Sequence, residues 1–462
     1  MLRNLIADHG GAYLLTVVLF FGATKGLGGG LLRAIALPYF QDAHATLETY
    51  HAVYTIALLM PWCSKPLWGH LSDNVPLCGY RKRWYVVMAA MVGLASSVVL
   101  GTLDLSINSA AGLFTAVSVS VVVCDLLFEA SYAERIKTAL LSGPDLVSFA
   151  WGMTMVGTAF AAVLAGVLGD SKRFDAAFLI AATPFVLLIA AVAANGLKEA
   201  KAAGVTSGPE TRVFAVVLVV ASGVLALTTV SDHPEDTVAA AAIATIVVLV
   251  TAAAALEHTV FACGFFVFVC EASSLNLVGA TDYFYTSECG TDFTYTFYAS
   301  CTALVASVFG LFGVYLFTKM DSWSPRNTFT VLTFAKVIVS TAEVIQTLRL
   351  NRAWGISDHA FFLVGEAALQ PVLSMMFFLP IVVLISSLVV EGEEAITYAL
   401  LAGLANFGNL FAAAVGSYVT RAYDITECNF DALPIALVVS HMVLPLAVIP
   451  LAHLVLPVKQ TI

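Results

Sequence analysis

The sequence has 462 residues and a formal net charge of −10, with 60% hydrophobic and only 11% charged residues. Soluble domains carry about 25% charged residues, so this chain has too few charges to cover a water-facing surface. We therefore expect most of its outer surface to face lipid. The acidic balance also argues against nucleic acid as a partner.

Apolar stretches long enough to cross a bilayer recur along the whole chain, at about 20 residues for each span. They lie at about 11–36, 44–63, 84–102, 109–128, 148–168, 176–195, 213–231, 238–257, 259–281, 297–317, 326–346, 360–388, 395–419 and 433–456. The stretch 238–281 is the hardest to divide, because only Glu257 and His258 interrupt it. The sequence therefore predicts an all-α polytopic membrane protein with about 12–14 spans.

The spans group as six, two and six, which predicts three regions. Residues 1–197 are expected to form an N-terminal six-helix half, 198–257 a linker with a two-helix insertion, and 258–462 a C-terminal six-helix half. Two such halves are typical of the major facilitator architecture, in which related repeats surround a substrate site. We expect a major facilitator-type bundle with about two extra helices.

Lysine and arginine in short loops orient such a chain, because cytoplasmic loops are enriched in them. Basic residues gather at 64–83, 129–147, 196–212 and 318–326, whereas the loops at 231–236, 281–292 and 423–431 are acidic or neutral. This pattern predicts cytoplasmic N- and C-termini, with the plasma membrane as the default location, although the pairs at 172–173 and at 349 and 352 depart from it. Cys289 and Cys428 both fall in expected external loops. A disulfide between them can form in that compartment, but the sequence leaves their separation open.

The loop after the second predicted span carries the strongest local pattern. It reads KPLWGHLSD over Lys65–Asp73 and is followed by the basic triplet Arg81–Arg83. Charge alone fits a simple cytoplasmic anchor, but the spacing G-x-L-x-D before a basic triplet resembles the loop signature of major facilitators. An aspartate that pairs with a basic cluster in one conformation and releases it in another suits an inner gate. Lys65, Asp73 and Arg81 are the predicted gating residues of this loop.

The same loop, continued as KPLWGHLSDNVPLCGYRKRWY, resembles the signature of the folate–biopterin transporter family. A second resemblance is the run from Asp125 through Glu129 to Glu134 and Arg135 at the end of the fourth span. The aromatic stretch 283–298 is similar to one in kinetoplastid members, and 391–395 resembles a further loop of the family. The resemblance implies transport of folates, unconjugated pterins or S-adenosylmethionine.

Three positions depart from the family pattern. Glu129 stands where the family usually has aspartate, and Trp68 and His70 stand where tyrosine and an apolar residue are commoner. The glutamate keeps the negative charge, so the family assignment survives. The choice among the family's substrates stays open.

Ionisable side chains inside predicted spans are costly and are therefore functional candidates. Lys25 lies mid-span beside the glycine-rich run 26–30, which can deform next to a ligand. It could meet an anionic substrate group, or it could form a structural ion pair with an acid on another span.

Asp125 and Glu129 are four residues apart and so share one helix face. Neighbouring carboxylates influence each other's protonation, which suits proton coupling. The alternative is that Glu129, Glu134 and Arg135 form a cytoplasmic charge network that closes the inner gate.

Further candidates lie in the second half. Glu271 is a carboxylate inside an apolar span, and Glu366 precedes Pro371, where we expect a kink. Trp151, in the first half, could stack on a pterin ring, although single aromatic residues in spans more often face the core or lipid. The predicted substrate-binding residues are Lys25, Asp125, Trp151, Glu271 and Glu366.

Nucleophile motifs, phosphate-binding loops and metal-ligand clusters are absent from the sequence, so we expect neither an enzyme nor a cofactor or metal. The expected partners are the lipid bilayer and a small-molecule substrate, and the chain is expected to be a monomer. The function expected is secondary transport by alternating access, and the family resemblance implies a folate or a pterin as the substrate, carried by a symporter. The rival hypotheses are transport of S-adenosylmethionine or another small metabolite, and a membrane receptor or scaffold that transports nothing.

Overall fold

The computed structural model describes residues 2–138, 143–201, 209–231, 233–317, 319–320, 323–387 and 394–456. Within these ranges the chain is helical apart from short connections. This described part contains two isolated β-bridges and no β-strand. Internal contacts divide it into two compact units. The first unit is Met1–His44 with Ser64–Ala215, and the second is Ala45–Cys63 with Val216–Ile462. The three regions predicted from the sequence stay a prediction.

Twelve helical runs in the described ranges are long and apolar enough to cross a membrane. They are Gly11–Asp42, Arg83–Thr102, Ile107–Arg135, Asp145–Asp170, Phe174–Ala193, Glu210–Thr228, Pro234–Ala255, Thr296–Phe317, Pro325–Thr347, Asp358–Ile381, Ala399–Ala422 and Leu433–Val455. They match twelve of the fourteen predicted stretches. The predicted all-α membrane fold is confirmed.

The other two stretches are not among these runs. The stretch 44–63 lies in an uninterrupted helical run that changes type along its length, from α4 (Leu47–Val53) through η2 (Tyr54–Leu59) and η3 (Met60–Ser64) to α5 (Lys65–Asn74). The continuous span predicted at 259–281 is wrong. The stretch 259–281 divides into α12 (His258–Ala272) and α13 (Val278–Thr286). Asn276 supports the second break, because its side-chain oxygen accepts from the N–H of Val278 at 2.9 Å and its own N–H donates to the carbonyl of Ala412 at 3.1 Å. Polar backbone groups freed by a break in an apolar interior need such partners.

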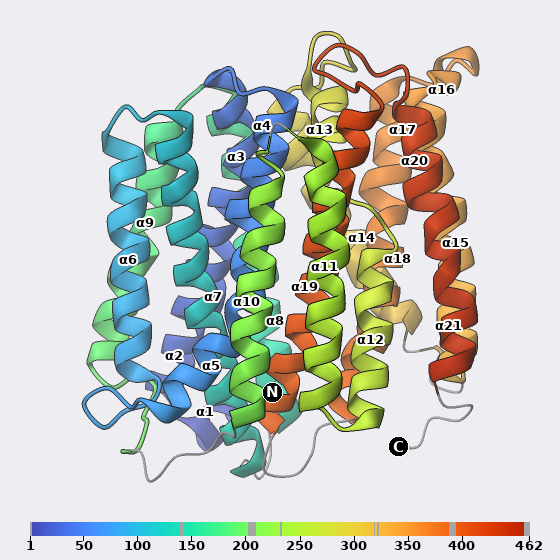
Figure 1. Ribbon diagram of the computed structural model, residues 1–462. Helices are drawn as coiled ribbons and strands as arrows, with labels where there is room; N and C mark the ends of the chain where they lie inside the picture. Colours follow the sequence, from blue (N-terminus) through green and yellow to red (C-terminus); the bar gives the residue numbers. More distant parts are fainter. Residues whose placement is uncertain are drawn as a thin grey trace. The chain divides into compact units, whose positions relative to one another are not determined.

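The first unit contains nine complete helical segments of the described chain and the start of α10 (Figure 1). They are α1 (Leu2–His9), α2 (Gly11–Val17), η1 (Val18–Gly29), α3 (Gly30–Asp42), α5 (Lys65–Asn74), α6 (Arg83–Thr102), α7 (Ile107–Thr138), α8 (Gly143–Asp170) and α9 (Phe174–Ala193), followed by α10 (Pro209–Thr228). Helices α6 and α9 lie side by side, and η1 packs on α8. Phe20 and Phe128 stack in its interior, with ring centroids 4.4 Å apart.

Glycines allow η1 and α8 to touch backbone to backbone. A Cβ atom at Gly26 would lie 2.8 Å from the carbonyl oxygens of Phe21 and Thr154, and one at Gly157 would meet the carbonyl oxygen of Gly22. Neither position has room for a side chain. This close approach fixes the position of η1, which carries Lys25, relative to α8.

The second unit contains α4, η2, most of α10 and the helices that follow (Figure 1). The later helices are α11 (Pro234–Ala255), α12, α13, η4 (Thr296–Cys301), α14 (Thr302–Phe317), α15 (Pro325–Thr347), α16 (Leu350–Ala353), α17 (Asp358–Val364), η5 (Gly365–Leu369), α18 (Gln370–Ser387), α19 (Glu394–Ala422), α20 (Leu433–Leu437), η6 (Val438–Val443), η7 (Leu444–Ala447) and α21 (Val448–Val455). Tyr50 of α4 donates to Asp282 of α13 at 2.8 Å, and Nε2 of His51 lies 2.9 Å from the carbonyl oxygen of Ala413 in α19. These contacts attach α4 to the second unit.

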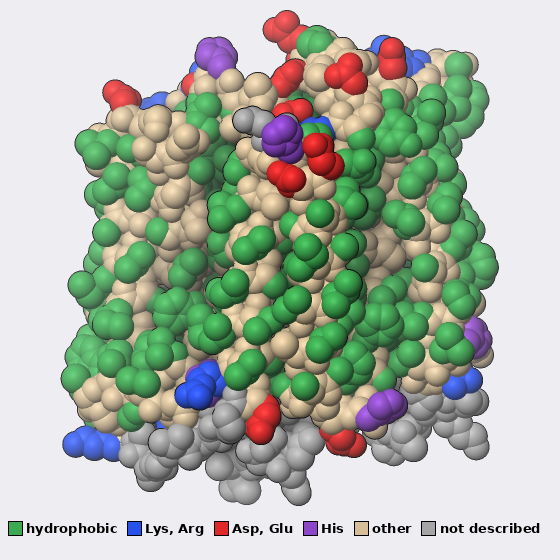
Figure 2. Space-filling view, viewed as in Figure 1, with side chains coloured by type: hydrophobic (Ala, Val, Ile, Leu, Met, Phe, Trp, Pro, Cys, Tyr) green, Lys and Arg blue, Asp and Glu red, His purple; other side chains and the backbone are tan. Residues whose placement is uncertain are grey.

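Hydrophobic side chains cover the outward face of α11, as Figure 2 shows in green along the helix. Val238, Ile243, Ile246 and Val250 are all exposed on it. An exposed apolar face of this length is stable only against other apolar material. We infer that α11 faces lipid.

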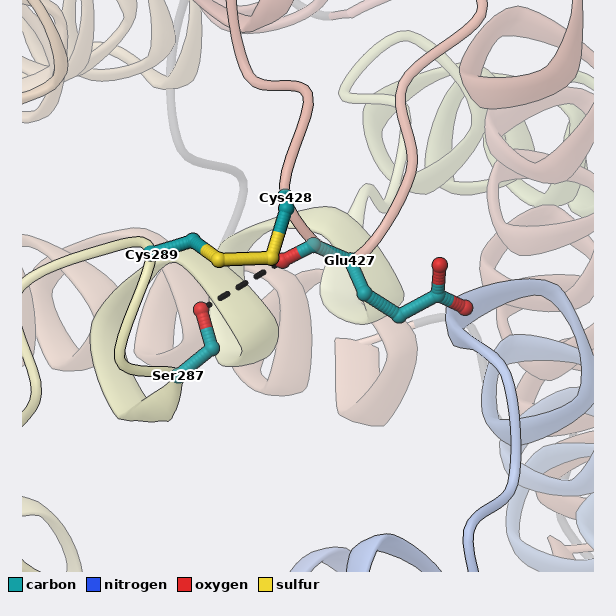
Figure 3. The surroundings of a disulfide bond; sticks show 4 residues. All are labelled: Ser287, Cys289, Glu427 and Cys428. Atoms are coloured by element: carbon teal, nitrogen blue, oxygen red, sulfur yellow. Dashed lines mark hydrogen bonds between the residues drawn. A yellow bond between two sulfur atoms is a disulfide. The ribbon is translucent and has the colours of Figure 1, made fainter.

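A disulfide joins Cys289 and Cys428, with 5.1 Å between their Cα atoms (Figure 3). Beside it the Ser287 hydroxyl donates to the carbonyl oxygen of Glu427 at 3.4 Å. The Glu427 side chain points away from the disulfide, and its carboxylate accepts from the N–H of Leu47 at 2.7 Å. The bond links segments 139 residues apart in the sequence.

Removing this disulfide is expected to lower the free energy of unfolding by about 2–4 kcal/mol, because it closes a long loop in the unfolded chain. The double variant Cys289→Ser, Cys428→Ser should melt at a lower temperature than wild type in detergent, and dithiothreitol should lower the melting temperature of wild type only. Cys78→Ser, which removes an exposed free thiol, is the control. Equal melting temperatures for wild type and the double variant would contradict this prediction.

Candidate functional site

Four charged side chains meet inside the first unit. Asp125 accepts from Lys25 at 2.6 Å and from Lys65 at 2.8 Å, and Lys65 also donates to Glu129 at 2.9 Å. The Asp125 side chain is 1% exposed and that of Lys25 is 12% exposed. The two ammonium groups balance the two carboxylates, as charges removed from water require.

Three separate elements supply this charge cluster. Asp125 and Glu129 lie one helical turn apart on α7, and Lys25 lies within the π-helical segment η1. Lys65 begins α5, where Pro66 occupies the first turn, a position at which proline suits a helix start. The sequence spacing had predicted that the carboxylates share a face, and the fold adds both lysines to it.

Aromatic rings cover one side of the cluster. The ammonium group of Lys25 lies 4.8 Å from the ring centroid of Trp151 on α8 and 5.4 Å from that of Phe21. Such contacts attract a cation most strongly where water is excluded. Trp151 therefore lies beside the charges.

Lys25 forms an ion pair with Asp125 of another span, which was one of the two roles that the sequence left open for it. Lys65 was predicted as a gating residue, but its side chain lies in the charge cluster with Asp125 and Glu129. An ammonium shared between two carboxylates can release one and keep the other. The cluster can therefore exchange a partner, such as an anionic ligand group or a proton, without leaving a buried charge alone.

The other predicted gating residues lie around a second feature of the first unit. A cavity of about 410 Å³ is lined by Arg81, Lys82, Glu134 and Arg135 among others. Lys82 bonds Glu134 at 2.6 Å, and Arg135 lies 3.9 Å over the ring of Tyr13.

Asp73 lies near the same basic loop. Burial raises the pKa of Asp73, while the nearby charges of Lys82 and Arg81 act in the opposite direction. Burial lowers the pKa of His70 in the same helix. Both groups are therefore sensitive to how closely this loop packs.

Glu199 organises this loop and was missed from the sequence. Its carboxylate accepts from the backbone N–H groups of Arg81, Lys82 and Arg83 at 2.8, 3.0 and 2.9 Å. It thus satisfies unpaired N–H groups at the start of α6, where Lys82 supplies no side-chain cap. The basic triplet indicated that an acid would be close, but nothing in the sequence selected Glu199.

Replacing Glu199 with alanine is expected to destabilise the first unit by about 1–3 kcal/mol, because buried N–H groups lose a charged acceptor. The melting temperature of purified protein in detergent should fall, and proteolysis near residues 75–83 should accelerate. Glu210→Ala, at an exposed position, is the control. An unchanged melting temperature for Glu199→Ala would show that the three hydrogen bonds contribute little.

Glu271 lies in the second unit, where it lines a cavity of about 280 Å³ together with Lys336, Asn276, Asn409 and His441. Glu271 and Lys336 also line an adjoining cavity of about 190 Å³. Lys336 is therefore near Glu271 in the fold.

Glu366 belongs to a neighbouring acidic group. Its Oε1 atom is buried with no hydrogen-bond partner among the described residues, and it lies within electrostatic range of Glu343. Glu343 in turn bonds Nδ1 of His441 at 2.9 Å, and Nε2 of His441 lies 2.9 Å from the carbonyl oxygen of Leu275. His441 thus links α15 to the segment between α12 and α13.

Comparison with known sequences gives one family. The sequence profile of the BT1 family matches residues 25–462. The chain is 27% identical to the folate-biopterin transporter of Synechocystis sp. over 83% of this chain and 70% of that protein. It is 24% identical to probable folate-biopterin transporter 2 of Arabidopsis thaliana over 99% of this chain and 85% of that protein.

Solved structures show the same fold at low identity. A POT family transporter in complex with 5-aminolevulinic acid superposes with a TM-score of 0.70 at 12% identity, covering 97% of this chain and 96% of that one. The nucleoside transporter NupG gives a TM-score of 0.60 at 12% identity, covering 96% and 98%.

Proposed function

The chain belongs to the BT1 family of membrane transporters, and from that premise we propose that it carries a folate or a pterin across a membrane by alternating access. Its similarity to folate-biopterin transporters of Synechocystis and Arabidopsis supports this substrate class. The single observation that carries the proposal is the charge cluster formed by Lys25, Lys65, Asp125 and Glu129 inside an apolar helical unit. Charges buried in a membrane protein generally mark a substrate or ion pathway.

Each member of the cluster has a role in this proposal. Lys25 compensates an anionic group of the substrate, and Trp151 beside it forms an aromatic wall of this site. Asp125 and Glu129 exchange a proton during the cycle, because a lysine shared between them can neutralise either one. The protein is then a proton symporter.

The inner gate is formed by the loop that Glu199 organises. Asp73, Arg81, Glu134 and Arg135 make and break ion pairs there as the cytoplasmic side closes and opens. The cavity of about 410 Å³ supports this role, since it provides space into which the side chains can move.

The orientation proposed is cytoplasmic termini in the plasma membrane, with the protein acting as a monomer. The Cys289–Cys428 disulfide supports it, because disulfides persist in oxidising compartments and both cysteines lie in loops expected outside.

A substrate panel in transport-deficient cells tests the proposal. Labelled folate and biopterin should accumulate above the level of vector-only cells, and a protonophore should reduce the accumulation. Labelled S-adenosylmethionine is the third compound in the panel. Its uptake without that of folate or biopterin would overturn the proposed substrate class, and accumulation that ignores the protonophore would overturn the proton coupling.

A further inference from the structure

Two adjoining cavities inside the second unit share the same charged wall. Glu271 of α12 and Lys336 of α15 line both, at about 280 Å³ and about 190 Å³. Small-molecule sites commonly measure roughly 300–1,000 Å³, so the pair lies at the small end of that range. Their size suits a bicyclic ring.

The opposite charges on this wall do not pair with each other. In the part of the chain that the structure describes, the carboxylate of Glu271 has neither a hydrogen bond nor an ion pair within 4.0 Å. It interacts with Lys336 only by electrostatic attraction over a longer distance. The ammonium group of Lys336 lies 5.6 Å from the ring centroid of Phe377 and has no carboxylate within 4.0 Å. The side-chain amide of Asn409 also faces the larger cavity without a hydrogen bond to the described protein.

Close packing of α19 on α12 fixes the position of Glu271. A Cβ atom at Gly408 would lie 2.6 Å from the carbonyl oxygen of Phe268 and 2.9 Å from Cβ of Glu271, so α19 presses directly against α12. The nearby histidine, His441, already uses both ring nitrogens, on Glu343 and on the carbonyl of Leu275. It therefore cannot neutralise Glu271 in this arrangement.

A partly buried carboxylate, ammonium and amide that line a cavity without partners are stabilised when something polar fills the space between them. The filler has to offer donors to Glu271 and, next to them, acceptors to Lys336. It also has to be flat enough to lie against Phe377. A pterin ring has this pattern along one edge, where the 2-amino group and N3–H are donors and the 4-oxo group and N5 are acceptors.

We propose that the two adjoining cavities lined by Glu271 and Lys336 bind the pterin ring of the substrate, an inference that rests on the proposed function. The carboxylate of Glu271 accepts from the 2-amino group and N3–H, and the ammonium group of Lys336 donates to the 4-oxo group and N5. The Asn409 amide bonds the remaining polar edge of the ring. Folate and biopterin share this edge and S-adenosylmethionine lacks it, so Glu271 and Lys336 select the substrate class.

The test compares pterin with lumazine, which has a 2-oxo group in place of the 2-amino group and keeps the 4-oxo group and N5. Purified full-length protein binds labelled biopterin, and each compound competes for it. Wild type should prefer pterin by about 10- to 100-fold, the range for a lost hydrogen bond to a charged group. A third competitor, 3-methylpterin, should also bind weakly because its N3 has no hydrogen.

Two variants separate recognition from folding. Glu271→Gln replaces one acceptor with a donor, which complements the 2-oxo group, so the preference for pterin should disappear or reverse. Lys336→Met should weaken both competitors alike and leave their ratio unchanged, since they share the acceptors. Glu235→Gln, at an exposed site, should change neither affinity nor ratio.

Each outcome decides between the two proposals. Wild type that binds biopterin but does not discriminate pterin from lumazine overturns the assignment of this cavity and leaves the proposed function standing. The assignment of the cavity is also overturned, and the proposed function left standing, if Glu271→Gln prefers pterin over lumazine as strongly as wild type does. Wild type that binds neither biopterin nor folate overturns the proposed function and this assignment with it. If Glu271→Gln does not fold, the three competitors on wild type still decide.

Discussion

Replacing Asp125 with asparagine is expected to reduce uptake of labelled folate or biopterin at least about 10-fold. The change removes the carboxylate that accepts from both Lys25 and Lys65, and leaves two buried ammonium groups facing Glu129 alone. Breaking a buried ion pair by removing one partner commonly costs about 3–5 kcal/mol. Uptake per molecule at the cell surface is the measurement.

Two further variants show whether the loss of uptake comes from the charge cluster or from a general loss of stability. Asp42→Asn removes the carboxylate of a Lys–Asp pair with the same 2.6 Å distance but side chains 71% and 38% exposed, and it should leave uptake unchanged. The double variant Lys25→Gln, Asp125→Asn restores charge balance, so its melting temperature should recover toward wild type while its uptake stays low. Wild-type uptake by Asp125→Asn would rule out a role for the charge cluster.

Replacing Gly157 with alanine is expected to disrupt the first unit. The new Cβ would meet the carbonyl oxygen of Gly22 and lie 2.9 Å from the Cα of Gly26, so η1 and α8 would have to separate. Overpacking against rigid backbone costs about 1–3 kcal/mol and sometimes more. The separation would also move Trp151 away from Lys25, so both melting temperature and uptake should fall.

Gly152 provides the matched control on the same helix. A Cβ there meets nothing within 4 Å, so Gly152→Ala should leave the melting temperature equal or slightly higher, since alanine favours helix. If Gly157→Ala melts like Gly152→Ala, the close contact between η1 and α8 contributes little to stability.

The spans were predictable because about 20 apolar residues in sequence leave the chain few alternatives in a bilayer. The interruption between α12 and α13 was not, because the groups that make it tolerable come from elsewhere. Asn276 is one of four polar residues within 270–278, and the carbonyl of Ala412 that receives its N–H lies on α19. Mean hydropathy over a span hides such a residue, and it carries no information about the distant carbonyl group that accepts its hydrogen bond.

The candidate site divides in the same way. Asp125 and Glu129 were placed on one face by their spacing, which depends only on helix geometry. The meeting of Lys25 and Lys65 with them depends on how three helices pack, which the loop signature around Lys65 does not specify. Glu199 was invisible because it bonds backbone N–H groups, which every residue except proline possesses.

Counterflow in proteoliposomes tests the central claim most directly, because it uses only the purified protein and needs no cellular metabolism. Vesicles preloaded with unlabelled folate or biopterin are diluted into the labelled compound, and label inside is followed with time. The account predicts that label enters transiently above the level of protein-free vesicles, and that Asp125→Asn abolishes this entry. Label that binds the vesicles without entering would contradict transport and indicate a receptor.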